Sequence, residues 1–113
     1  MKNLEIINHL NGLIQLEESG KEYPVKVGYA IAKNLKKLKD LYAVYDPERA
    51  KIMNSFETMS EEEKEKAQKK LQELLSIENE EVKIHKVNYD DLQGCSQMSI
   101  KELETLEFMI EEE

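Results

Sequence analysis

The chain has few of the residues that usually build chemical sites. Its 113 residues include one cysteine, two histidines and no tryptophan. The single cysteine, Cys95, excludes an intrachain disulfide. A structural zinc site needs about four nitrogen or sulfur ligands at characteristic spacings. His9, His85 and Cys95 do not supply that set, so we expect no metal ion.

Glycine is also scarce, and its placement argues against nucleotide binding. The four glycines, Gly12, Gly20, Gly28 and Gly94, stand singly, so no glycine-rich loop is present to bind phosphate. Nucleophilic catalysis would need Cys95 or a serine beside a base. His85 and Cys95 could meet in space, but a lone thiol is more often a small apolar group. We therefore predict that the protein is not an enzyme and uses no cofactor.

Long apolar runs and an excess of positive charge are missing too. No stretch approaches the roughly 20 apolar residues of a membrane span, and the first twelve residues do not resemble a signal peptide. The 16 Lys and Arg residues are outnumbered by 24 Asp and Glu residues, which gives a net charge of −8. Binding to nucleic acid needs clustered Lys and Arg, and the one basic cluster is KNLKKLK, residues 33–39. We predict a cytoplasmic protein that binds neither membranes nor nucleic acid and whose acidic surface suits a basic protein partner.

Helical periodicity is what the sequence does contain. Between residues 3 and 18, apolar residues recur at intervals of three and four, which predicts an amphipathic helix. Asn3 is a candidate N-cap, and Gly20 can end the helix in a left-handed conformation.

A second apolar stripe runs from Val27 to Phe56 and predicts a long central helix that starts near Pro24. Pro47 interrupts the stripe, because a proline disfavours helical dihedrals at the residue before it. The stripe keeps its phase across Pro47, which favours one kinked helix over two separate helices.

Capping boxes mark the starts of two more helices. Ser60 and Glu63 form one box, and Ser99 and Glu102 form the other. The last helix should carry Leu103, Leu106 and Ile110 on one face and fray at its acidic end.

The segment VKIHKV, residues 82–87, is predicted to be a strand, because Val82 and Ile84 alternate with Lys83 and His85. A strand needs backbone partners. The candidates are the first residues, MKNLEI, the loop 21–25, or another chain. The overall prediction is a mainly α fold in a single domain, 1–113, with about four helices, a long central helix, and one short strand or a small two-stranded sheet.

An open strand edge can recruit a partner, or it can be guarded by charges such as those of Lys83 and Lys86. The acidic C-terminal run, which has six carboxylates and no basic residue from Glu102 to Glu113, is a second candidate contact surface. The candidate partner-binding residues are therefore Val82, Lys83, Ile84, His85, Glu107 and Glu111.

Two blocks of the sequence resemble a known family. They are YPVKVGYAIAKNLKKLKDLY, within residues 22–45, and ELLSIENEEVKIHKVNYDDL followed by MSIKELETLEFMIEEE, within residues 71–113. Both are similar to blocks in small proteins of unknown function from tailed phages of Gram-positive bacteria and their prophages. The chain departs from that family in its first residues, MKNLEI, which look shortened, and in residues 57–65, where a longer insertion is missing.

The resemblance implies a phage or prophage origin and the cytoplasm of a bacterial host, and it brings no catalytic residues. We therefore expect a non-enzymatic accessory protein that binds a host or phage protein, for example as an acidic inhibitor of a host defence system or host enzyme. The alternative is a structural or virion-assembly protein that forms a homo-oligomer through its strand.

Overall fold

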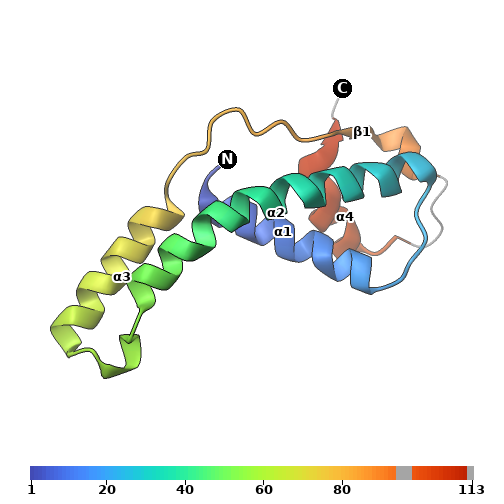
Figure 1. The fold of residues 1–113 in the computed structure, drawn as a ribbon. Coiled ribbons are helices and arrows are strands. Elements are labelled where there is room, and N and C mark those ends of the chain that lie inside the picture. The colour runs from blue at the N-terminus through green and yellow to red at the C-terminus, as the bar shows by residue number, and fades with distance from the viewer. Residues whose placement is uncertain (94–97, 112–113) are drawn as a thin grey trace.

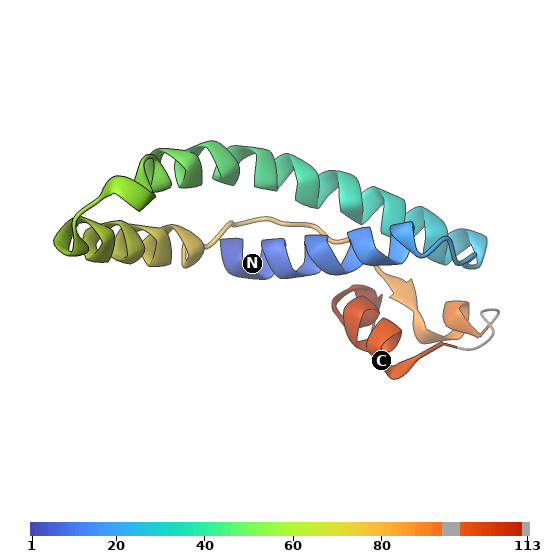
Figure 2. The same ribbon diagram turned by 90° about the horizontal axis from the view of Figure 1, so that it is seen from below.

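One long helix, α2 (Val25–Met53), is the spine of the molecule (Figure 1). The computed structural model describes residues 1–93 and 98–111. Helix α1 (Asn3–Glu18) packs along the first half of α2, and α3 (Glu61–Leu75) packs along its second half. Figure 2 shows α1 and α3 lying nearly end to end on the same side of α2. The result is an elongated molecule of 54 × 28 × 20 Å.

Helix α2 continues through Pro47, as the unbroken phase of its apolar stripe predicts. Proline removes one backbone hydrogen bond and crowds the preceding turn, which bends a helix rather than ending it when packing holds both sides. Tyr45, two residues before Pro47, is buried. Figure 2 shows α2 as one bowed ribbon.

The main core lies where α1, the first half of α2 and the C-terminal segments meet. It contains the apolar stripes predicted for the first two helices, joined by four residues from the last third of the chain: Val87, Leu92, Leu106 and Met109. Val87 and Leu92 belong to segments that contact α2, and Leu106 belongs to the short helix α4 (Ile100–Leu106), which packs against α1. Both ends of the sequence therefore contribute to a single apolar cluster.

Gly12 lies where α1 packs against α4. A Cβ atom added there would lie 2.8 Å from Cγ2 of Thr105. The Thr105 hydroxyl donates a hydrogen bond to the carbonyl of Lys101 (2.9 Å), which fixes the direction of the methyl group. Gly12 weakens α1 because glycine has a low helix propensity, but its lack of a side chain leaves room for α4 to pack against α1.

The helix starts agree with the predicted caps in two of three cases. Ser60 accepts a hydrogen bond from the backbone N–H of Glu63 (3.2 Å), and Ser99 forms the full capping box with Glu102. Asn3 is not a cap, which corrects our expectation. It lies inside α1 and is buried, because its side chain donates to the carbonyl of Leu74 (2.8 Å) and accepts from the side chain of Asn79 (2.8 Å).

The last helix is shorter than predicted. α4 ends at Leu106 and is followed by a 3-10 turn, η3 (Glu107–Met109), and then by strand β2 (Ile110–Glu111). Ile110 lies in phase with Leu103 and Leu106, so the helical stripe appeared to continue, but this residue pairs with another strand. Two further 3-10 turns, η1 (Phe56–Thr58) and η2 (Tyr89–Leu92), connect the remaining elements.

The small sheet is present, but its position corrects the prediction. Strand β1 is Val87–Asn88 and pairs in parallel with β2, with Val87 opposite Ile110 and Asn88 opposite Glu111. Residues 82–86 belong to no strand. The first residues of the chain pair elsewhere, through an antiparallel bridge between Lys2 and Glu78. Within residues 1–93 and 98–111, no helix is both long and apolar enough to cross a membrane.

Candidate partner-binding site

The segment that the sequence marks as a strand finds its hydrogen-bond partners on α2. The side chain of Asn34 is fully buried and holds His85 at both backbone groups. Its Oδ1 accepts from the His85 N–H (2.8 Å), and its Nδ2 donates to the His85 carbonyl (2.9 Å). The ammonium group of Lys37 donates to the carbonyl of Lys83. An asparagine side chain thus does for His85 what a neighbouring strand would do.

The four predicted residues of this segment have different surroundings. Ile84 is partly buried against the main core. The His85 ring meets the ring of Tyr29 edge-on, with centroids 5.6 Å apart. Val82 and Lys83 line an open hollow of about 410 Å³ beside the middle of α2. Its other lining residues are Lys37, Asp40, Leu41, Glu80 and Glu81.

Glu107, predicted from the acidic run, lines a different hollow of about 270 Å³, which we call the C-terminal hollow. The six residues that line it are Tyr89, Ile100, Leu103, Glu104, Glu107 and Ile110. Ile100 is 77% exposed and Tyr89 is 61% exposed. Glu111 lies beside this hollow in sequence, in β2 after Ile110, and is exposed.

Ile100 and Tyr89 lie at the ends of secondary-structure elements. The capping box of Ser99 starts α4, which makes Ile100 its first residue. Tyr89 directly follows β1, and the pairing of Val87 with Ile110 holds the ends of β1 and β2 together. The hollow is therefore formed by one end of the small sheet and one face of α4.

The hollow has an apolar floor and an acidic rim. Glu104 and Glu107 are both exposed. No ion pair joins either carboxylate to a residue of the described chain. Exposed apolar side chains bordered by negative charges that form no ion pair suit a partner with an apolar anchor and flanking positive charges.

A third carboxylate of α4 has a structural role. Glu102 accepts hydrogen bonds from the Lys21 ammonium (2.9 and 3.1 Å) and from the Tyr23 hydroxyl (2.8 Å). The bond from Lys21 is the main cause that lowers the pKa of Glu102 from its ordinary value of 4.5 to about 2, although burial opposes the shift. These contacts join the start of α4 to the loop between α1 and α2.

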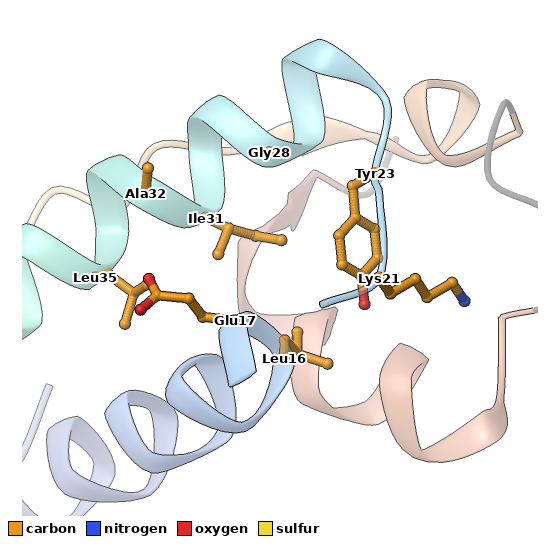
Figure 3. Close-up of a pocket in the computed structure, with 8 residues that line it drawn as sticks. All are labelled: Leu16, Glu17, Lys21, Tyr23, Gly28, Ile31, Ala32 and Leu35. Carbon is orange, nitrogen blue, oxygen red and sulfur yellow. The ribbon is translucent and has the colours of Figure 1, made fainter. Parts of the chain in front are cut away.

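The same loop borders a small hollow of about 210 Å³ between α1 and α2 (Figure 3). Figure 3 shows Leu16 and Glu17 on α1 facing Ile31 and Leu35 on α2. Pockets for small organic ligands usually measure about 300–1,000 Å³. This hollow is smaller than that range and does not form a typical ligand site.

The two histidines are packed as aromatic rings. His9 stacks on Phe108, with centroids 4.0 Å apart and ring planes 15° apart. Burial lowers the pKa of His9, and the charge of Glu5 partly opposes this shift. No group of three or more metal-binding side chains occurs in the part of the chain that the structure describes. Cys95 lies outside that part, so the expectation that its thiol is a small apolar group, and not a nucleophile beside His85, stays a prediction.

No family model matches the chain, and no curated protein or solved structure matches it. The phage resemblance therefore stays a hypothesis that rests on the two sequence blocks. The C-terminal hollow contains one predicted residue, Glu107, and several that sequence reasoning missed. Ile100 is an isoleucine directly after a capping serine and three residues before Leu103 on the same helical face, a pattern that does not distinguish an exposed side chain from a buried one.

Proposed function

We propose that the protein is a non-enzymatic phage or prophage accessory protein that works in the bacterial cytoplasm by binding another protein in its C-terminal hollow. The segment bound carries a large apolar side chain flanked by Lys or Arg. The observation that carries this proposal is the exposure of Ile100 and Tyr89 beside Glu104 and Glu107.

Exposed apolar side chains such as those of Ile100 and Tyr89 are costly to leave in water. Binding energy at protein interfaces is concentrated in a few buried anchors, with tyrosine frequent among them, and a polar rim excludes water around them. Ile100 and Tyr89 supply apolar area, and the carboxylates select a basic partner and raise its rate of association. A host or phage protein with a basic amphipathic segment fits this chemistry, and an inhibitor of a host enzyme or host defence system is one form of this function.

The alternative function, self-assembly of a structural protein through residues 82–87, the segment predicted from the sequence to be a strand, has less support. Adding a strand there requires free backbone groups. Asn34 already bonds both backbone groups of His85, and Lys37 bonds the carbonyl of Lys83. A second chain would have to displace these side chains first.

The test begins with a displayed library of random helical peptides selected against the immobilised protein. We expect enrichment of peptides with one large apolar residue between basic residues. Affinity is then measured by fluorescence anisotropy for the wild type and for a Glu104→Lys, Glu107→Lys variant. Affinity should fall about tenfold or more in that variant, because like charges now face each other, and wild-type binding should weaken with salt.

A matched control carries Glu57→Lys and Glu61→Lys, which change the net charge equally at the far end of the molecule (Figure 1). Equal loss in both variants would mean that net charge, and no particular surface, governs binding. Enrichment of acidic peptides would contradict the proposal. A photocrosslinking amino acid at position 100 in infected cells then identifies the natural partner, and the same residue at position 57 is its control.

A further inference from the structure

Many of the lysines lie in two segments that the fold places side by side. Residues 25–39 and 82–89 together contain seven of the 16 Lys and Arg residues and none of the 24 Asp and Glu residues. The first segment is the start of α2, and the second leads through β1 to Tyr89. Figure 1 shows the second segment running along α2 before it enters β1. A protein whose net charge is −8 therefore carries a coherent positive region.

An aromatic ring lies among these lysines. The Tyr29 side chain is 59% exposed, and its ring meets the His85 ring edge-on. The ammonium group of Lys33 lies 5.7 Å from the centroid of the Tyr29 ring. Lys33 and Lys36 follow Tyr29 at spacings of four and seven residues, so they share its face of α2. Both lysines are exposed, and the tyrosine is therefore surrounded by positive charge on the helix and on the neighbouring segment.

The region around Tyr29 has the composition of a contact surface, and we call it the basic surface. Its charged members are Lys33, Lys36, Lys37, Lys83 and Lys86. The ammonium group of Lys37 donates to the carbonyl of Lys83, which joins the two segments. No ion pair links any of these five lysines to another residue that the structure describes. Tyrosine is frequent among interface anchors, and unpaired charges select the sign of a partner.

Carboxylates border the basic surface at both ends and limit its length. Asp40, Glu80 and Glu81 line the hollow beside the middle of α2, at one end. At the other end, the carboxylate of Asp91 lies 3.9 Å from the ammonium group of Lys26. These ends are about 21 Å apart along α2, at a rise of about 1.5 Å per residue. A nucleic acid strand or a membrane would extend past both ends and meet these negative charges, whereas a short acidic stretch of a protein fits between them.

The basic surface lies close to the C-terminal hollow. His85 beside Tyr29 and Tyr89 of the hollow are four residues apart, so their Cα atoms are separated by at most about 14 Å. A positive surface and a hollow with an acidic rim are therefore within reach of one peptide. The two surfaces also act together as a filter, because the first repels a uniformly basic partner and the second repels a uniformly acidic one.

We propose that the partner segment bound in the C-terminal hollow continues into a short acidic stretch that lies on the basic surface. This inference rests on the proposed function and adds the order of charges in the partner. An apolar anchor flanked by Lys or Arg is joined by a spacer of about four residues to several Asp or Glu residues. The lysines and the Tyr29 hydroxyl donate hydrogen bonds to these carboxylates. Exposed ion pairs are individually weak, so the acidic stretch adds affinity when the anchor tethers it, and an acidic peptide without the anchor is not retained.

The test compares two synthetic peptides by fluorescence anisotropy. Each peptide has one phenylalanine between two pairs of arginines, then a spacer of four glycine and serine residues. It ends in four glutamates or, in the control peptide, in four glutamines. Both peptides are also made with the tail before the anchor, which covers both directions of binding. In one direction the glutamate tail should raise the affinity for the wild type about tenfold or more, and salt should reduce this gain.

Protein variants locate the gain. The surface variant exchanges three exposed lysines of the basic surface for glutamine: Lys33→Gln, Lys36→Gln and Lys86→Gln. The control variant makes the same exchange at three exposed lysines of α3: Lys66→Gln, Lys69→Gln and Lys70→Gln. The surface variant should bind the two tails equally, and the control variant should keep the full gain. Circular dichroism checks that both variants keep their helices.

The outcomes separate this inference from the proposed function. If the glutamine-tailed peptide binds the wild type but the glutamate tail adds nothing, the inference alone is overturned. An equal loss of the gain in both variants would also overturn it, because net charge would then explain the effect. A single-stranded oligonucleotide that binds the wild type at physiological salt, and not the surface variant, would assign the basic surface to nucleic acid instead. If neither peptide binds the wild type, the proposed function fails together with the inference.

Discussion

Replacing Asn34 with alanine removes both hydrogen bonds that hold His85 against α2. Each buried backbone group left without a partner costs about 1–3 kcal/mol, and the partial exposure of His85 places the cost in the lower part of that range. Two groups at about 1–2 kcal/mol each give about 2–4 kcal/mol. Alanine recovers about 0.6 kcal/mol through its higher helix propensity. The free energy of unfolding should therefore fall by about 1.5–3.5 kcal/mol, out of a total of about 5–15 kcal/mol.

The assay combines urea denaturation with hydrogen exchange. Asn8→Ala is the matched control, because Asn8 is exposed on α1 and experiences the same gain in helix propensity. In Asn34→Ala the His85 amide should also lose its protection from exchange. Asn34→Asp separates the two bonds, because a carboxylate still accepts from the His85 N–H but cannot donate to its carbonyl. Its stability should improve as the carboxyl group is protonated. Equal losses in the Asn34→Ala and Asn8→Ala variants, or a protected His85 amide without Asn34, would refute the reasoning.

Three further outcomes are expected. Leu38→Ala, which empties a fully buried site, should cost about 2–5 kcal/mol in urea denaturation, whereas Val44→Ala at a 73% exposed site should cost under about 0.5 kcal/mol. Gly12→Ala should lower the free energy of unfolding by about 1 kcal/mol, because the clash of the new Cβ with Thr105 outweighs the higher helix propensity of alanine. In a Thr105→Ser background, which lacks the clashing methyl group, Gly12→Ala should instead stabilise the protein. Because the pKa of Glu102 falls from 4.5 to about 2 on folding, its contribution is present above pH 4.5 and is lost as the pH drops toward 2. Calorimetry should show Glu102→Gln melting below the wild type near neutral pH, with the difference shrinking over that acidic range.

The helices were predictable because their signals are local. Spacing of apolar residues, a capping serine and a terminal glycine all act within a few residues, and they correctly gave α1, the uninterrupted α2 and the start of α3. Pro47 did not mislead, because the stripe on either side of it keeps one phase.

The strands were harder because their pairing depends on distant parts of the chain. A strand of two residues is too short to show the alternation of apolar and polar residues that identifies strands. Ile110 also fits the helical spacing of Leu103 and Leu106, so the sequence does not separate its strand from a helix. The one available signal for the segment at residues 82–86 was Asn34, an asparagine within the apolar stripe of α2. A buried amide needs partners, but the sequence does not say that His85 supplies them.

The candidate site was predictable only through its charge. The acidic run indicated Glu107, because carboxylates without nearby basic residues are visible in the sequence. Ile100 and Tyr89 were missed, because an apolar residue gives no sequence signal that distinguishes burial from exposure when the element around it is short.

The shared core has a consequence for the order in which the chain folds. The hairpin of α1 and α2 and the hairpin of α2 and α3 join neighbours in sequence, so each can form early during synthesis. The apolar cluster that α1 and α2 share stays incomplete, however, until Leu106 and Met109 join it. A nascent chain without its last helix therefore leaves part of this cluster uncovered, and chaperone binding and aggregation compete with folding during that interval.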